Sequence, residues 1–180
     1  MSNPILGLGC LLVASPELLD PNFQRTVVFV IGHDGEGTFG LVLNRPVQAT
    51  LADVLESPGE GAARVKVLRG GPVQPEMLQF LARGGGPGRA VLPDVGVGGD
   101  LDALLEHARG GAEVRAYAGY AGWGAGQLER ETREGSWIVA PASAAHVFDV
   151  PAERLWAEVL RGLGGKYAWL ALDGGDPRSN

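Results

Sequence analysis

Residues 26–44 read TVVFVIGHDGEGTFGLVLN, and this stretch decides the fold. Its first part, residues 26–32, is rich in β-branched and aromatic residues, which favour a strand. HDGEG follows as a turn, in which Asp34-Gly35 and Gly37 are expected to supply positive backbone φ angles. Residues 38–44 then return as a second strand. The stretch therefore predicts an antiparallel hairpin, which argues against a doubly wound parallel fold.

Strand and helix patterns continue on both sides of the hairpin, without a strict βαβ repeat. Ser15 and Pro16 are expected to start a short helical turn, and Thr50 and Asp53 resemble a capping box. Residues 77–83 fit a strand or a helix equally well. The other predicted strands are 5–14, 64–70, 113–121, 136–142 and a broken strand over 89–98, and the predicted helices are 51–56, 100–109, 127–135 and 151–163. Such interleaving is typical of the α+β class.

The chain has 180 residues and a mass of 18.8 kDa, which suits one domain. We expect a single domain over residues 1–180, with a core over 5–163 and a polar, frayed tail over 173–180. Lys and Arg number 15 against 21 Asp and Glu, giving a net charge of −6. No basic run occurs, so direct nucleic-acid binding is not expected.

Localisation and cofactors are predicted from features that the sequence lacks. A secretory signal requires a positively charged residue near its start, and the first one in this sequence is Arg25. No apolar stretch approaches the roughly 20 residues of a membrane span. We therefore expect a cytoplasmic protein with no membrane partner. The single cysteine, Cys10, lies in an apolar run, and the histidines show no metal-ligand spacing. No metal and no cofactor are predicted.

A glycine-rich segment, GYAGWGAGQLE over residues 119–129, is the first candidate site. A strand that runs through four glycines into a helix brings backbone N–H groups together, as anion sites require. The segment lacks the lysine of a phosphate-binding loop, so tight packing over a buried Trp123 is the alternative. The candidate binding residues here are Tyr120, Gly122, Trp123, Gly124 and Gln127.

Two further strand ends add candidates to the same binding surface. NRPV, residues 44–47, ends the hairpin with Asn44 and Arg45, and LRGGPV, residues 68–73, carries Gly70 and Gly71 beside Arg69. The guanidinium of Arg45 suits a carboxylate or a phosphate, and an ion pair with a nearby acid is the alternative. Because loops at strand ends present functional groups on a rigid scaffold, we expect these residues to meet Tyr120–Gln127 in space.

No catalytic residue is predicted. His33 is expected in the hairpin turn, and His107 and His146 on helices without partners. Glu129, Glu131 and Glu134 are expected on a solvated helix face. A nucleophile with a base and an orienting group is therefore not evident.

Four ordered blocks nevertheless resemble one family of small bacterial proteins, the YqgE/AlgH family. The blocks are residues 11–47, RGGPVQPE (69–76), YAGYAGWGAGQLERE (117–131) and GSWIVAPA (135–142), within a resemblance that spans 8–163. The resemblance implies a compact α+β domain whose mixed, bifurcated sheet forms a small barrel-like core flanked by helices. Some members carry the label of transcriptional regulator, and the resemblance transfers no catalytic residues.

The sequence thus favours a non-enzymatic binding or regulatory protein with a glycine-rich loop surface. The partner would be a protein or a small anionic ligand, and its identity and the oligomeric state stay open. Two alternatives also stay open: an enzyme acting on a small anionic substrate, held by Arg45 and the 122–127 loop, and a transcriptional regulator acting directly on DNA.

Overall fold

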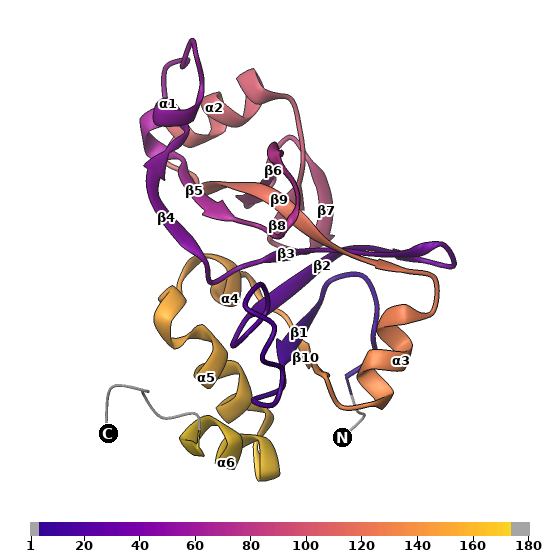
Figure 1. Cartoon of the computed structure of the whole chain (residues 1–180). Helices are drawn as coiled ribbons and strands as arrows, with labels where there is room; N and C mark the ends of the chain where they lie inside the picture. The colour runs from indigo at the N-terminus through magenta and orange to yellow at the C-terminus, as the bar shows by residue number, and fades with distance from the viewer. Residues whose placement is uncertain (1–3, 174–180) are drawn as a thin grey trace.

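The computed structural model describes residues 4–173, and the predicted hairpin lies at its centre (Figure 1). Strands β2 (Val27–Asp34) and β3 (Gly37–Val42) pair antiparallel around a turn at Gly35-Glu36. The carboxylate of Asp34 accepts hydrogen bonds from the backbone N–H groups of Glu36 and Gly37. Gly37 has a φ of 152°, and a Cβ there would lie 2.4 Å from the carbonyl oxygen of Trp123. The expected positive φ at Gly35 is wrong, because only Gly37 adopts it in this turn.

The sheet forks at its longest strands. Besides β2 and β3, its strands are β1 (Cys10–Ala14), β4 (Pro46–Thr50), β5 (Lys66–Arg69), β6 (Val73–Arg83), β7 (Arg89–Leu92), β8 (Val95–Val97), β9 (Val114–Gly124) and β10 (Trp137–Pro141). The main path runs β10-β1-β2-β3-β9-β6-β8-β7, while β4 pairs with β5, which pairs in parallel with β9. The carboxyl half of β9 pairs with β3, and its amino half lies between β5 and β6. This strongly curled, mixed sheet confirms the predicted bifurcated α+β architecture.

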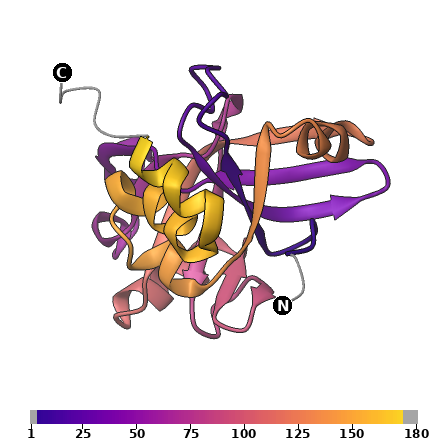
Figure 2. The ribbon, with the colours of Figure 1, turned by 90° about the horizontal axis from the view of Figure 1, so that it is seen from below.

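Helices cover both ends of the curled sheet (Figures 1 and 2). At one end lie α1 (Leu51–Val54), the 3-10 turn η1 (Ala62–Arg64) and α2 (Leu101–Arg109). At the other end α4 (Ala144–Phe148), α5 (Ala152–Leu163) and α6 (Gly165–Asp173) pack together, while α3 (Gln127–Arg133) lies beside the hairpin. The predicted capping box at Thr50 is present, since Thr50 N–H donates to Asp53, and Asp100 caps α2 by accepting from Ala103 N–H.

Several boundaries differ from those predicted, for local reasons. The first strand covers 10–14 rather than 5–14, because a turn closes from Gly7 to Cys10 and Gly9 has a φ of 81°. Ser15 caps a simple turn, accepting from Glu17 N–H at 3.3 Å, and no helix follows it. Residues 77–83 are strand, within β6. Helices α4 and α6 were not predicted, and residues 174–180 of the predicted tail lie outside the described residues.

Residues 122–124 of the glycine-rich segment also differ from the loop that the sequence predicts. Gly122, Trp123 and Gly124 extend β9 instead of forming a loop, because they pair with Gly37–Phe39 of β3. Between residues 4 and 173, no helix is both long enough and apolar enough to cross a membrane.

Candidate functional site

The chain between β1 and β2 forms a tight turn that separates two pockets. Within this turn, residues 20–25, the backbone N–H groups of Phe23 and Gln24 donate to the carbonyl of Asp20. Asn44 fixes the end of the turn from the neighbouring strand end: its Oδ1 accepts from Val27 N–H at 3.0 Å and its Nδ2 donates to the Arg25 carbonyl at 2.9 Å. Both polar atoms of the Asn44 side chain are therefore engaged in hydrogen bonds that fix the backbone of the turn.

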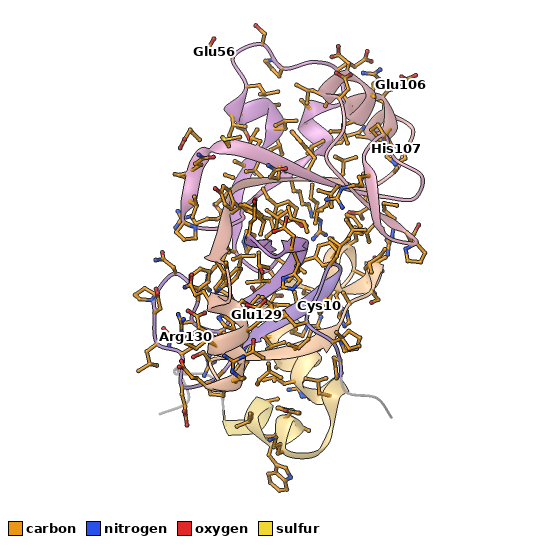
Figure 3. The ribbon with its side chains drawn as sticks, turned by 90° about the vertical axis from the view of Figure 1, so that its right-hand side faces the viewer. Cys10, Glu56, Glu106, His107, Glu129 and Arg130 are labelled. Atoms are coloured by element: carbon orange, nitrogen blue, oxygen red, sulfur yellow. The ribbon has the colours of Figure 1, made fainter. Side chains whose placement is uncertain are left out.

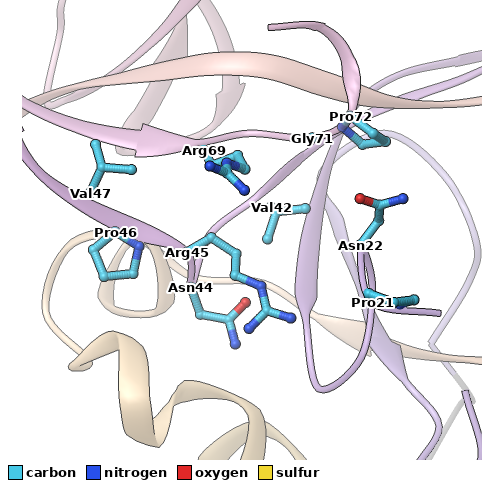
Figure 4. Close-up of a pocket in the computed structure, with 10 residues that line it drawn as sticks. All are labelled: Pro21, Asn22, Val42, Asn44, Arg45, Pro46, Val47, Arg69, Gly71 and Pro72. Carbon is cyan, nitrogen blue, oxygen red and sulfur yellow. The ribbon is translucent and has the colours of Figure 1, made fainter. Parts of the chain in front are cut away.

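The first pocket, here called the arginine pocket, has a volume of about 380 Å³ and contains part of the predicted site. Arg45 follows β3 and Arg69 ends β5, so two neighbouring strand ends bring their guanidinium groups to one cavity (Figure 4). The lining residues are Pro21, Asn22, Val42, Asn44, Arg45, Pro46, Val47, Arg69, Gly71 and Pro72. Among the described residues, arginine is thus the only charged type in the lining.

The charge of this pocket is not neutralised by the protein. Burial, and then the positive charge of Arg69, lower the pKa of Arg45. Arg45 Nη2 donates to the Gln24 carbonyl at 2.6 Å, and the expected alternative of an ion pair is not seen: within residues 4–173, neither arginine forms a salt bridge. A guanidinium pair without a carboxylate is a site that an anion would stabilise.

Gly70 and Gly71, at the end of β5, lie in close backbone contact with β9. A Cβ on Gly70 would lie 2.4 Å from the Gly119 carbonyl oxygen, and one on Gly71 would lie 2.1 Å from the Tyr120 carbonyl carbon. Gly70 also bridges two strands, because its N–H donates to Ala118 and its carbonyl accepts from Val42. The glycines are therefore required by the crossing of the chain over β9, and only Gly71 lines the cavity.

The second pocket, here called the aromatic pocket, lies on the other side of the turn and has a volume of about 200 Å³. Of the predicted residues, Gly122, Trp123 and Gln127 line it, whereas Gly70, Tyr120 and Gly124 line neither pocket. Its lining residues are Leu18, Asp20, Phe23, Gly122, Trp123, Gln127, Glu131, Ser136 and Trp137. Gly124 contributes indirectly, since its backbone N–H donates to Gln127 Oε1 at 3.0 Å. Tyr120 lines neither pocket, and its ring packs 5.4 Å from that of Phe39.

Glu131 organises the aromatic pocket. Its Oε2 accepts from the indole N–H groups of Trp123 and Trp137, at 2.9 and 3.1 Å, and its Oε1 accepts from Gln127 at 3.1 Å. The expectation of a solvated Glu131 is therefore wrong. Gln127 and Glu131 are four residues apart on α3, so they share one face, and this spacing was the available sequence signal. Nothing in the sequence indicated that Trp137 would reach the same carboxylate.

His33 also has partners that the sequence did not reveal. It lies on β2 rather than in the turn, with Nδ1 2.7 Å from Thr38 Oγ1 and Nε2 3.7 Å from Glu129. A hydroxyl, an imidazole and a carboxylate in series resemble a catalytic triad. Thr38, however, is only 2% exposed, so its hydroxyl is closed to a substrate. The three residues tie the hairpin to α3.

The other histidines are far from this cluster or engaged locally. Figure 3 shows His107 at the α2 end of the molecule, well away from Glu129 and Arg130 on α3. His107 Nε2 lies 2.8 Å from the Arg83 carbonyl, and His146 Nδ1 accepts from Ser143 N–H. Over the described ranges, no three His, Cys, Asp or Glu side chains gather as a metal would require.

Comparison with known proteins supports the resemblance noted from the sequence. A family model described as AlgH-like matches residues 11–168. The chain is 41% identical to the UPF0301 protein CT0663 of Chlorobaculum tepidum, covering 93% of this chain and 92% of the relative. It is 44% identical to the UPF0301 protein SCO2948 of Streptomyces coelicolor, covering 96% and 94%.

Solved structures share the fold. The solution structure of the AlgH protein from Pseudomonas aeruginosa matches with a TM-score of 0.74 and 32% identity, covering 94% of this chain and 96% of that one. The crystal structure of DIP2367 from Corynebacterium diphtheriae matches with a TM-score of 0.81 over 95% and 94%, at 24% identity. None of these names states an activity.

Proposed function

The chain belongs to the AlgH-like family, and we propose that it is a non-enzymatic binding protein of the cytoplasm whose arginine pocket holds the anionic group of a small ligand. The observation that carries the proposal is the pairing of Arg45 and Arg69 in one cavity without a carboxylate in its lining. The chain as a whole has a net charge of −6, so this local excess of positive charge is opposite in sign to the overall electrostatic field of the protein.

The size and chemistry of the pocket favour a metabolite-sized ligand. Its volume of about 380 Å³ falls within the range of small-molecule sites. Planar guanidinium groups bind carboxylates and phosphates through two parallel hydrogen bonds. The side chain of Arg69 is exposed and makes no hydrogen bond or ion pair within the described part of the chain, so its donors are available.

Binding without turnover is proposed because the pocket offers donors and no base. Neither Arg45 nor Asn44 acts as a base near neutral pH, and His33 does not line the cavity. A regulatory role would follow if ligand binding altered the turn at residues 20–25, which Arg45 contacts through the Gln24 carbonyl.

The test is thermal unfolding with inorganic phosphate and with succinate, which separate the two anion chemistries. A ligand at 100 times its dissociation constant stabilises the fold by about 2.7 kcal/mol. We expect one of the two anions to raise the melting temperature, and the variant Arg69→Gln to weaken that binding by roughly tenfold or more, since a charged hydrogen bond contributes about 1.5–3 kcal/mol.

The matched control is Arg130→Gln, which removes the same charge from an exposed position on α3. It should leave anion binding unchanged. Equal weakening of anion binding by Arg69→Gln and Arg130→Gln would show that the effect comes from the overall charge of the protein. A DNA gel-shift at physiological salt that depends on Arg69 would instead support a transcriptional regulator that acts directly on DNA.

A further inference from the structure

Three aromatic rings meet at the wall of the aromatic pocket. The rings of Trp123 and Trp137 lie 5.6 Å apart at an interplanar angle of 84°, and those of Phe23 and Trp137 lie 5.5 Å apart at 78°. Trp123 is 7% exposed and Trp137 3% exposed, so surrounding residues hold both indoles in place. The near-perpendicular rings pack edge to face against one another, and Phe23, Trp123 and Trp137 each contribute to the cavity wall.

The charge in this pocket is negative. Asp20 and Glu131 both line it, and no Lys or Arg of residues 4–173 does. Within residues 4–173, neither carboxylate forms a salt bridge with a cationic side chain. Three donated hydrogen bonds orient Glu131 without neutralising its charge. A cation in the cavity would therefore meet two carboxylates that the protein itself leaves unpaired.

We propose that the aromatic pocket binds an organic cation of the quaternary or tertiary ammonium class. The faces of aromatic rings attract such cations through the ring quadrupole, and a nearby carboxylate adds a direct charge interaction. A volume of about 200 Å³ admits a trimethylammonium-sized group. Lysine-like ammonium groups are bound less well in such a site, because their stronger hydration must be removed.

This site is separate from the arginine pocket and opposite to it in charge. The turn at residues 20–25 contributes Asp20 and Phe23 to the aromatic pocket, and Pro21 and Asn22 to the arginine pocket. The proposal goes beyond anion binding and does not depend on it, because no residue lines both cavities.

The experiment is a titration of the ¹⁵N-labelled chain with tetramethylammonium chloride. The chain has four tryptophans, and their indole N–H signals report separately on the pocket (Trp123, Trp137) and on the rest of the fold (Trp156, Trp169). We expect saturable shifts of the first pair alone. Sodium chloride at equal concentration controls for ionic strength, and tert-butanol is the neutral molecule of matched shape.

The variants separate charge from structure. Glu131→Gln keeps an oxygen that accepts from the indoles while removing the charge, and it should weaken tetramethylammonium binding by roughly tenfold or more. Glu129→Gln makes the same change on the same helix outside the pocket, and should leave binding unchanged. Asp20→Asn, at an exposed residue, tests the second carboxylate should Glu131→Gln fail to fold.

Three results would overturn the proposal. Equal shifts with tert-butanol would show an apolar cavity without preference for charge. Equal weakening by Glu129→Gln and Glu131→Gln would show a diffuse field effect. An absence of saturable shifts in the folded wild-type chain would show that the walls do not admit the cation.

Discussion

At the scale of single residues, polar side chains at neighbouring positions of the candidate site differ in how many of their polar atoms the protein itself engages. Asn44 and Arg45 are neighbours in sequence and both line the arginine pocket, yet both polar atoms of the Asn44 side chain bind backbone, whereas the Arg45 side chain makes one hydrogen bond within residues 4–173, to the Gln24 carbonyl. Sequence placed both in the same candidate site. Spacing alone could not distinguish them, because their difference lies in which backbone groups come within reach.

Asn44→Ala should therefore destabilise the fold. It leaves the Val27 N–H and the Arg25 carbonyl without their partners, and an unsatisfied buried group costs about 1–3 kcal/mol. Urea unfolding at neutral pH measures this loss, with Asn22→Ala, at an exposed pocket residue, as the control. A loss equal to that of the control would contradict the structural role.

At the scale of elements, local signals were sufficient for the hairpin, α2 and α3, where turn residues and caps lie next to apolar runs. They failed for α6, since Gly164 and Gly165 both have positive φ and mark the end of α5 without showing that another helix begins. Strand β6 was ambiguous because its identity depends on pairing with β9, which is distant in sequence. For the same reason Arg69 and Glu131 could not be assigned to the pockets.

The contact between β6 and the end of α4 has a predicted pH dependence. Hydrogen bonding to Arg83 lowers the pKa of Asp149 from its ordinary value of 3.8, and Arg83 Nη1 donates to Asp149 Oδ1 at 2.8 Å. A lowered pKa in the folded state means that the stabilisation is present above the unfolded pKa and is lost as pH falls through the folded value.

Asp149→Asn should thus lower the melting temperature at neutral pH and have a progressively smaller effect as pH falls below about 3.8, the unfolded carboxyl value. Thermal unfolding of both proteins across this range measures it. Both side chains are partly exposed to solvent, which screens the ion pair, so the effect at neutral pH should be small. A difference between the two proteins that stays constant with pH would contradict the assignment.

At the scale of the whole molecule, β9 connects the three groups of buried residues. It contributes Tyr117 to the group around α5, Ala121 and Trp123 to the group around β1 and β10, and Val114 and Ala116 to the group around α2. Because one strand is part of every group, loss of packing in one removes support from the others. The helix α5 joins the same structure through Trp156, whose indole N–H donates to the Ala14 carbonyl at 2.8 Å.

We therefore predict a single cooperative unfolding transition for the whole chain, a prediction that the sequence also makes. Trp156→Ala should shift this transition by about 3–5 kcal/mol without splitting it, since it removes a buried aromatic side chain that is 5% exposed. Calorimetry of both proteins provides the measurement. Two resolved peaks in either protein, or a shift below about 1 kcal/mol, would mean that α5 is peripheral and that β9 does not couple the three groups.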